Sequence, residues 1–218
     1  MKILIVSATK FEIEPLLSEM KSFSLFRENF ICCTYKNLEI DFLITGVGMV
    51  ATAYSMGKIL NDTYNIAFNA GICGTFNKNL ELGTVVNIYE DCFSELGAED
   101  DEEFLTLEDL KLTGINKFIN KTELNNKTLT ALPKVNGITV NTTHGNEQSI
   151  NKISKRFHPM IESMEGAAFM YVCEEAKIKY AQIRAVSNLV ERRNKESWNI
   201  PLAIENLNKE IIKIVNEF

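Results

Sequence analysis

Along the whole chain, continuous apolar runs alternate with stretches in which apolar residues recur at helical spacing. The continuous run at 2–8 predicts a buried strand, and the spacing at 11–20 predicts a helix after it. Two runs at 30–35 and 38–46 predict a hairpin that turns at Lys36 and Asn37. Further strands are predicted at 65–71, 84–92, 137–143 and 180–188, and further helices at 47–60, 165–177 and 201–218.

This alternation is typical of α/β proteins. We expect residues 1–218 to form a single-domain, three-layer sandwich, in which a mixed, mostly parallel sheet carries helices on both faces. No internal repeat, low-complexity tract or linker divides the chain. Residues 95–132 are the least readable part, and we treat them as a candidate mobile segment over a site.

Composition narrows the class of protein. A net charge of -6 argues against a nucleic-acid partner, because phosphate contacts need a basic face. No apolar run reaches the roughly 20 residues that span a bilayer, so we expect no membrane partner. The five cysteines form no C-x-x-C pair, which suits a cytoplasmic protein. The two histidines, His144 and His158, lie far apart, so we expect no metal site. The acidic stretch at 97–104 is interpreted as a solvated loop.

Polar and glycine residues gather where the predicted strands end. Ligands in such sheets bind at the carboxyl ends of strands, so this pattern predicts a shared cleft. The six clusters lie at 7–12, 46–48, 69–74, 141–144, 163–165 and 187–191.

Two glycine motifs bear on cofactors and phosphate. GVGMVA at 46–51 formally matches a dinucleotide-binding pattern, but Asn69 ends the next strand where a ribose-binding acid is needed. We therefore interpret it as a tight turn and expect no cofactor. NAGICGTF at 69–76 predicts a second glycine turn with accessible backbone N–H groups. It holds no Lys or Arg, and Ile72 stands where a hydroxyl would help an anion, which argues against phosphate.

The stretch SMEGAAF at 163–169 allows two interpretations of Glu165. A carboxylate at a helix start favours the positive end of the helix dipole, so Glu165 could simply stabilise the helix. Alternatively it is a binding carboxylate aimed into the cleft. The two roles are compatible at one helix start.

Four motifs in order closely resemble the nucleoside phosphorylase and nucleosidase superfamily: the strand before Glu12, NAGICG, SMEGAA and RAVSN. Within it, the stretch at 184–204 looks most like the futalosine hydrolases, which remove hypoxanthine from futalosine in a menaquinone pathway. Methylthioadenosine/S-adenosylhomocysteine nucleosidases are close relatives. The resemblance implies the superfamily fold, a small-molecule purine nucleoside as substrate and no cofactor. It also implies a homodimer or higher homo-oligomer, in which a loop of the partner subunit is a candidate to complete the site.

The resemblance assigns roles to individual residues. Glu12 matches the general base that activates water, whereas Glu14, two positions on, points elsewhere and is expected to be a solvated acid. Glu165 matches the carboxylate that binds the ribose hydroxyls, and Met164 matches a residue that packs on the nucleoside.

Three more positions follow from the same motifs. Gly71 and Gly74 belong to the binding turn. Asn188 stands where adenine-specific nucleosidases carry an acid that protonates N7, so this chain is expected to prefer a 6-oxopurine. The amide could donate to both N7 and O6 of such a base.

The sequence leaves several choices open. The alternatives to a futalosine-type hydrolase are an adenine-releasing nucleosidase, a purine nucleoside phosphorylase and a non-catalytic nucleoside-binding module. A phosphorylase needs arginines near the glycine turns, and no arginine lies within them. The loop at 141–147 is the candidate for purine stacking, and His144 in it either contacts substrate or lies on the surface. Arg192 and Arg193 are candidates for a substrate carboxylate or are solvated.

Overall fold

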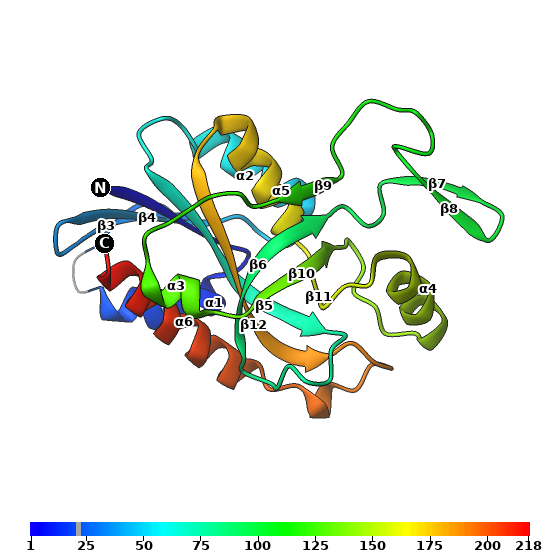
Figure 1. The fold of residues 1–218 in the computed structure, drawn as a ribbon. Coiled ribbons are helices and arrows are strands. Elements are labelled where there is room, and N and C mark those ends of the chain that lie inside the picture. Colours follow the sequence, from blue (N-terminus) through cyan, green and yellow to red (C-terminus); the bar gives the residue numbers. More distant parts are fainter. Residues whose placement is uncertain (21–22) are drawn as a thin grey trace.

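One large sheet organises the computed structural model, which describes residues 1–20 and 23–218 (Figure 1). Its strand order is β11-β10-β6-β12-β5-β1-β4-β3-β2, with β9 paired to β6. β11 also pairs with the end of β5, so one half of the sheet curls back on itself. The strands are β1 (Lys2–Ser7), β2 (Phe23–Arg27), β3 (Phe30–Tyr35), β4 (Leu38–Ile44), β5 (Ile66–Thr75), β6 (Val85–Cys92), β9 (Lys117–Ile119), β10 (Lys134–Thr139), β11 (Ile161–Ser163) and β12 (Lys179–Leu189).

Helices cover both faces of this sheet. Figure 1 shows α2 and α5 on one side and α1 and α6 on the other. A separate hairpin of β7 (Gly97–Asp100) and β8 (Glu103–Thr106) projects at the edge of the molecule. The helices are α1 (Lys10–Glu19), α2 (Met49–Ile59), α3 (Lys127–Ala131), α4 (Glu147–Phe157), α5 (Gly166–Ala176), α6 (Ile200–Asn216) and the 3₁₀ turn η1 (Lys195–Ser197).

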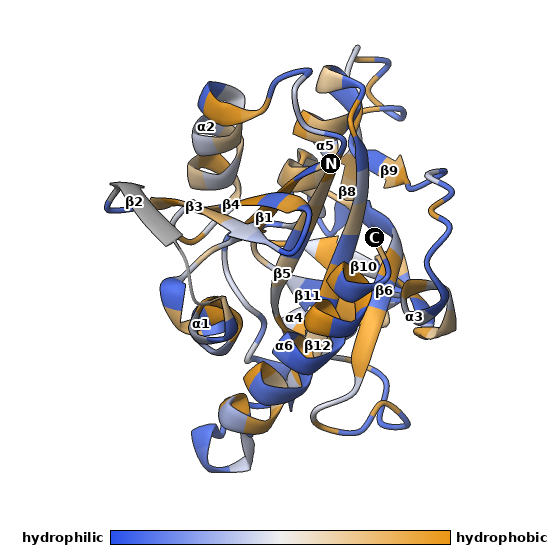
Figure 2. Cartoon of the chain, turned by 90° about the vertical axis from the view of Figure 1, so that its left-hand side faces the viewer, coloured by the Kyte–Doolittle hydropathy of each residue, from blue (hydrophilic) through white to orange (hydrophobic). Residues whose placement is uncertain are grey.

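The first strand shows why the sheet needs two helical layers. Its side chains alternate between the faces, so Ile3 and Ile5 join the hydrophobic core under α1 and α6. Leu4 and Val6 join the second core, under α2 and α5. All four side chains are fully buried. Figure 2 shows the resulting concentration of hydrophobic residues in the interior strands.

The mixed α/β architecture with helices on both faces is confirmed. Strands β4, β1, β5 and β12 run parallel at the centre, so their carboxyl ends lie at one edge. Antiparallel pairing occurs in the β2–β3–β4 meander and where β6 and β11 meet β12 and β5. The hairpin at Lys36 is confirmed as well, and Lys36 has a φ of 53°. No helix in the described ranges is long and apolar enough to cross a membrane.

Two local predictions are wrong. The stretch at 69–76 is no turn, because β5 continues to Thr75 with Ile72 and Cys73 paired to Ala185 and Val186 of β12. The acidic residues at 97–104 are part of a hairpin, since cross-strand backbone pairing orders a stretch whose polarity indicated a loop.

Candidate active site

A cavity of about 320 Å³ opens beside the carboxyl ends of β1, β5 and β12. All six polar clusters predicted from the sequence contribute to its wall, so the shared cleft is confirmed. No residue of the described segment 95–132 lines it, contrary to the expectation of a cover there. The lining residues are Ala8, Thr9, Phe11, Glu12, Val47, Ile72, Cys73, Gly74, Thr143, His144, Glu162, Ser163, Met164, Glu165, Ser187, Asn188, Leu189, Glu191, Arg193, Trp198 and Ile200.

Glu12 is buried in the first turn of α1 and faces the cavity. Its Oε2 accepts three hydrogen bonds: from Ser7 Oγ at 3.0 Å, from the Thr9 N–H at 2.9 Å and from Thr9 Oγ1 at 3.0 Å. Among the described residues its Oε1 accepts one, from the Ile72 N–H at 3.2 Å. Oε1 is therefore the oxygen with a lone pair left for a molecule in the cavity.

A buried amide from the last helix fixes the turn that carries Glu12. Asn208 Nδ2 donates to the Glu12 carbonyl at 2.8 Å, and its Oδ1 accepts from the Leu16 N–H at 3.0 Å. This side chain thus binds both ends of one α1 turn. Glu14 is exposed, as expected for a solvated acid.

Glu165 does not cap the helix that it begins. It is the N-cap residue of α5, but its side chain makes no capping hydrogen bond. Other groups satisfy the first N–H donors of the helix: Ser163 Oγ accepts from Gly166 at 3.3 Å, and Thr139 Oγ1 accepts from Ala167 at 2.7 Å. The carboxylate is consequently free to face the cavity, while its position at the helix start still suits the helix dipole.

The surroundings of Glu165 hold a buried charge in place. Its Oε1 accepts from the Gly48 N–H at 3.1 Å, and its Oε2 lies 3.4 Å from Arg184 Nη1. Gly48 has a φ of 97°, a conformation that favours glycine, so the turn at 46–48 supplies a binding N–H. Burial raises the pKa of Glu165, the Arg184 guanidinium and the Gly48 N–H oppose that rise, and Glu12 adds to it.

Arg184 enters the site through the space left by a glycine. The guanidinium is 1% exposed and also donates to Asn69 Oδ1. A Cβ on Gly71 would lie 2.2 Å from Arg184 Nη1 and 3.1 Å from Glu12 Oε1. Gly71 therefore accommodates the arginine instead of lining the cavity as predicted. Arg184 lies outside the glycine segment at 69–76 in the sequence, but in the structure its guanidinium packs against that segment.

Asn188 lines the cavity with an amide whose orientation is fixed. Its Oδ1 accepts from Ser187 Oγ at 2.8 Å, and its Nδ2 donates to the Leu189 carbonyl at 2.9 Å. Because a carbonyl can only accept, one amide N–H is used and one remains, not the two expected for N7 and O6. A Cβ on Gly74 would lie 3.1 Å from Asn188 Nδ2, so this glycine lets the amide approach the strand.

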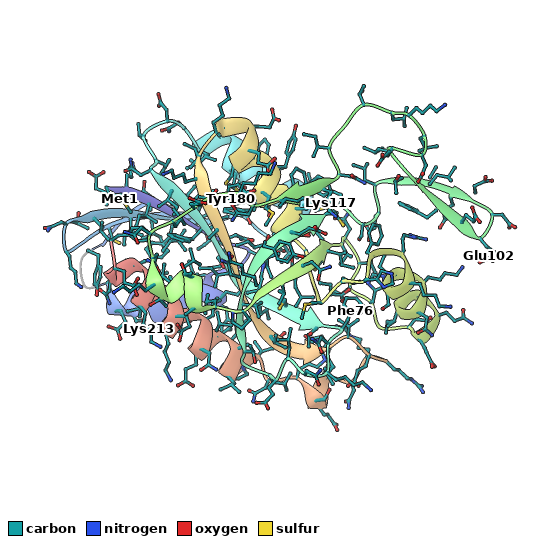
Figure 3. All side chains as sticks on the ribbon, viewed as in Figure 1. Met1, Phe76, Glu102, Lys117, Tyr180 and Lys213 are labelled. Atoms are coloured by element: carbon teal, nitrogen blue, oxygen red, sulfur yellow. The ribbon has the colours of Figure 1, made fainter. Side chains whose placement is uncertain are left out.

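His144 lies in the cavity wall as the partner of a buried acid. Its Nδ1 lies 2.6 Å from Glu162 Oε2, and its backbone N–H donates to Glu162 Oε1 at 3.0 Å. The exposed fractions of the two side chains are 14% and 4%. Phe76, labelled at the end of β5 in Figure 3, has its ring 6.4 Å from the imidazole ring. The sequence left His144 open and missed Glu162 altogether.

The remaining wall is largely apolar and carries one of the two candidate arginines. Met164, predicted to pack on the nucleoside, is half-buried and lines the cavity. Arg193 lines the cavity and lies over the Trp198 ring at 5.1 Å, and its N–H donates to the Gly145 carbonyl at 3.4 Å. Arg192 is exposed and does not line the cavity.

Two of the missed residues carried a usable signal. Arg184 is a charged residue inside the apolar strand at 180–188, a position where an arginine needs a buried partner. Glu162 follows the apolar pair Met160–Ile161 and precedes Glu165 by three residues. Nothing in the sequence pairs Glu162 with His144, because their contact depends on the curl of the sheet. Among the described residues no group of three or more His, Cys, Asp or Glu side chains is arranged to hold a metal ion.

Comparison with known proteins gives one consistent family. The model of the Phosphorylase superfamily matches residues 2–218. A futalosine hydrolase from Acidothermus cellulolyticus is 29% identical over 175 residues, covering 77% of this chain and 71% of that protein. A 5′-methylthioadenosine/S-adenosylhomocysteine nucleosidase from Haemophilus ducreyi is 27% identical over 237 aligned residues, covering 100% and 99%.

The solved structures agree on the fold. The 5′-methylthioadenosine/S-adenosylhomocysteine nucleosidase of Campylobacter jejuni superposes with a TM-score of 0.85 at 22% identity, covering 100% of both chains. At this identity the likeness shows the architecture.

Proposed function

The chain belongs to the Phosphorylase superfamily, and we propose that it is a nucleosidase that hydrolyses the N-glycosidic bond of a 6-oxopurine nucleoside, with futalosine as its substrate. The observation that carries the proposal is the pair of buried carboxylates, Glu12 and Glu165, brought from distant segments to one cavity that Asn188 also lines. The similarity to futalosine hydrolases supports the choice of substrate. A cytoplasmic place and a role in menaquinone synthesis are part of the same proposal.

The chemistry follows from the environment of each carboxylate. Water attacks the anomeric carbon while the bond to the purine breaks, and the bonding electron pair leaves with the purine. Glu12 Oε1, with a free lone pair, takes the water proton, a role typically worth about 10²–10⁴-fold in rate. Glu165 accepts hydrogen bonds from ribose hydroxyls, and its charge stabilises the positive charge that develops on the sugar.

The cations of the cavity favour water over phosphate as nucleophile. Arg184 is fully buried and already bonded to Glu165 and Asn69. Arg193 is the other arginine near the cavity, and its guanidinium lies on Trp198. A phosphorylase needs a cation free to bind phosphate beside the ribose, and the contacts of Arg184 with Glu165 and Asn69 leave it unsuited to that role. Among the described residues Arg193 keeps its guanidinium N–H donors free, and we assign it to the carboxylate of futalosine.

A second candidate is the adenine-releasing nucleosidase activity of the H. ducreyi relative, which matches this chain over its full length. Asn188 is the observation against it. Its remaining amide N–H can donate to N7 or O6 of a 6-oxopurine, whereas the 6-amino group of adenine is itself a donor and cannot accept it.

The test is a base-release assay with futalosine, inosine and methylthioadenosine. The proposal predicts hypoxanthine from the first two, little adenine from the third, and loss of at least about 10²-fold in kcat for Glu12→Gln. Preferential release of adenine would establish the second candidate instead. Absence of any base release would leave a nucleoside-binding module.

We further propose a homodimer or higher homo-oligomer. The start of α2 supports this, because Val47, Val50 and Tyr54 are 56%, 80% and 66% exposed, and a group of exposed large apolar side chains is typical of an interface. Light scattering during size-exclusion chromatography would show a mass of at least twice the chain mass. A monomer at micromolar concentration would contradict the proposal.

A further inference from the structure

The proposed reaction leaves one requirement unmet. A purine departs with an extra electron pair, and it leaves more readily when a proton reaches its imidazole ring. Asn188 has one amide N–H left and no acidic proton to give. Some other group in the cavity has to supply the proton.

His144 is placed to do so. Its Nδ1 is held by Glu162, while its Nε2 has no hydrogen-bond partner among the described residues. Gly74 brings this pair close to the amide, since a Cβ there would lie 3.1 Å from Asn188 Nδ2 and 3.6 Å from Glu162 Cγ. The amide and the histidine pair thus adjoin the same glycine and line the same cavity.

Resting on the proposed function, we propose that His144 is the catalytic acid that protonates the leaving purine, and that Glu162 is its positioning residue. The imidazolium Nε2–H passes its proton to N7 as the bond between the anomeric carbon and N9 breaks. The bonding electrons move into the purine, which leaves neutral. Water supplies the new bond to carbon, and its proton goes to Glu12.

Glu162 contacts His144 twice and thereby fixes the orientation of the imidazole ring. Its carboxylate accepts from both the backbone N–H and Nδ1 of His144, so the ring cannot rotate without losing a buried hydrogen bond. This arrangement of a carboxylate that orients a histidine is a general means of holding an acid–base group.

The role requires that Nδ1 donates to Glu162 while Nε2 carries the proton for the purine, and only the imidazolium has both protons. Removing the Glu162 carboxylate should therefore lower kcat/KM only for substrates whose leaving group needs a proton.

The experiment compares two kinds of leaving group. His144→Gln should lower kcat/KM for inosine or futalosine by about 10²–10⁴-fold and leave 4-nitrophenyl β-D-ribofuranoside within a few-fold, because nitrophenolate leaves without a proton. The ratio between the two substrates does not depend on how much of the variant is folded. His158→Asn is the matched control, since His158 is exposed and has a φ of 46°, which Asn tolerates.

The outcomes separate the two proposals. Equal losses on both substrates, or no loss on the purine nucleosides, would overturn the acid role of His144 and leave the hydrolase intact. A Glu162→Gln variant that keeps the wild-type ratio of kcat/KM between the two substrates would overturn the positioning role. A wild-type enzyme that cleaves the nitrophenyl riboside but no purine nucleoside would contradict the proposed function itself.

Discussion

A buried acid under the start of α5 makes stability depend on pH in a direction that can be measured. Asp91 is fully buried, and burial raises the pKa of its carboxyl to about 6 from the ordinary 3.8. Hydrogen bonds from Gln182 Nε2 at 3.0 Å, Thr139 Oγ1 at 2.9 Å and the Cys92 N–H at 2.8 Å oppose that rise. Thr139 in turn accepts from the Ala167 N–H, so the acid supports the helix that begins at Glu165.

The direction in which the free energy of unfolding changes with pH follows from proton binding to Asp91. Between pH 3.8 and about 6 the folded protein holds a proton on Asp91 that the unfolded chain has released, so the free energy of unfolding falls as the pH rises. The contribution is complete below the unfolded pKa and is lost above the folded one. The two pKa values correspond to about 3 kcal/mol in total, of which roughly 2 kcal/mol is lost between about pH 4.5 and 7.5.

Asp91→Asn removes this dependence and can keep the surrounding contacts. Asn Oδ1 can still accept from Thr139 and Cys92. Its NH₂ group would then face Gln182, whose Oε1 has no hydrogen-bond partner among the described residues. A turn of the Gln182 amide pairs the two groups, so we expect the variant to fold.

The assay is urea unfolding of wild type and Asp91→Asn from pH 4.5 to 7.5. The difference between the two free energies should change by roughly 2 kcal/mol, with wild type losing stability relative to the variant as pH rises. Asp62→Asn, at an exposed position, is the matched control and should show little pH-dependent difference. A wild-type-minus-Asp91→Asn difference that stays constant over this range would show that folding does not raise the pKa of Asp91.

Three further substitutions test the site. Gly71→Ala should displace the Arg184 guanidinium, destabilise the protein by about 3–5 kcal/mol and abolish turnover, and a variant of unchanged melting temperature would contradict this packing. Asn188→Asp should shift the kcat/KM ratio between 6-amino and 6-oxo substrates toward the amino compound by about 5- to 150-fold, measured by simultaneous release of both bases; an unchanged ratio would remove Asn188 from base selection. Arg193→Ala should raise KM for futalosine and leave KM for inosine near the wild-type value. The control Arg192→Ala, at an exposed position outside the cavity, should change neither KM. Equal effects of Arg193→Ala on both nucleosides would assign Arg193 to binding of the base.

The spacing of apolar residues predicted most of the fold, because the side chains that are buried in each strand and helix determine that spacing. The strand at 2–8 alternates between two cores, and the helices at 47–60, 165–177 and 201–218 match α2, α5 and α6 to within a few residues. The short strand β11 and the polar helix α4 were not predicted. β11 has three residues, too few for a pattern, and α4 buries only Ile153.

The site was predictable where a residue's role is local and less so where it depends on tertiary contacts. Glu12 and Glu165 stand at strand and helix ends, where sequence motifs apply, and the structure brings both to the cavity. Gly71 was assigned to the ligand, but its missing side chain serves Arg184 from a neighbouring strand. The free hydrogen bonds of Asn188 were overcounted, because the contact of its amide with the next carbonyl has no sequence signature.

The central claim is that Glu12 activates water against a purine nucleoside. It is tested most directly by identifying the sugar product of futalosine cleavage in the presence of excess phosphate, with phosphorus NMR and a reducing-sugar assay on the same sample. We predict one free reducing sugar for each hypoxanthine released, a rate independent of phosphate, and no product from Glu12→Gln above about 1% of wild type. Formation of a sugar 1-phosphate would contradict it.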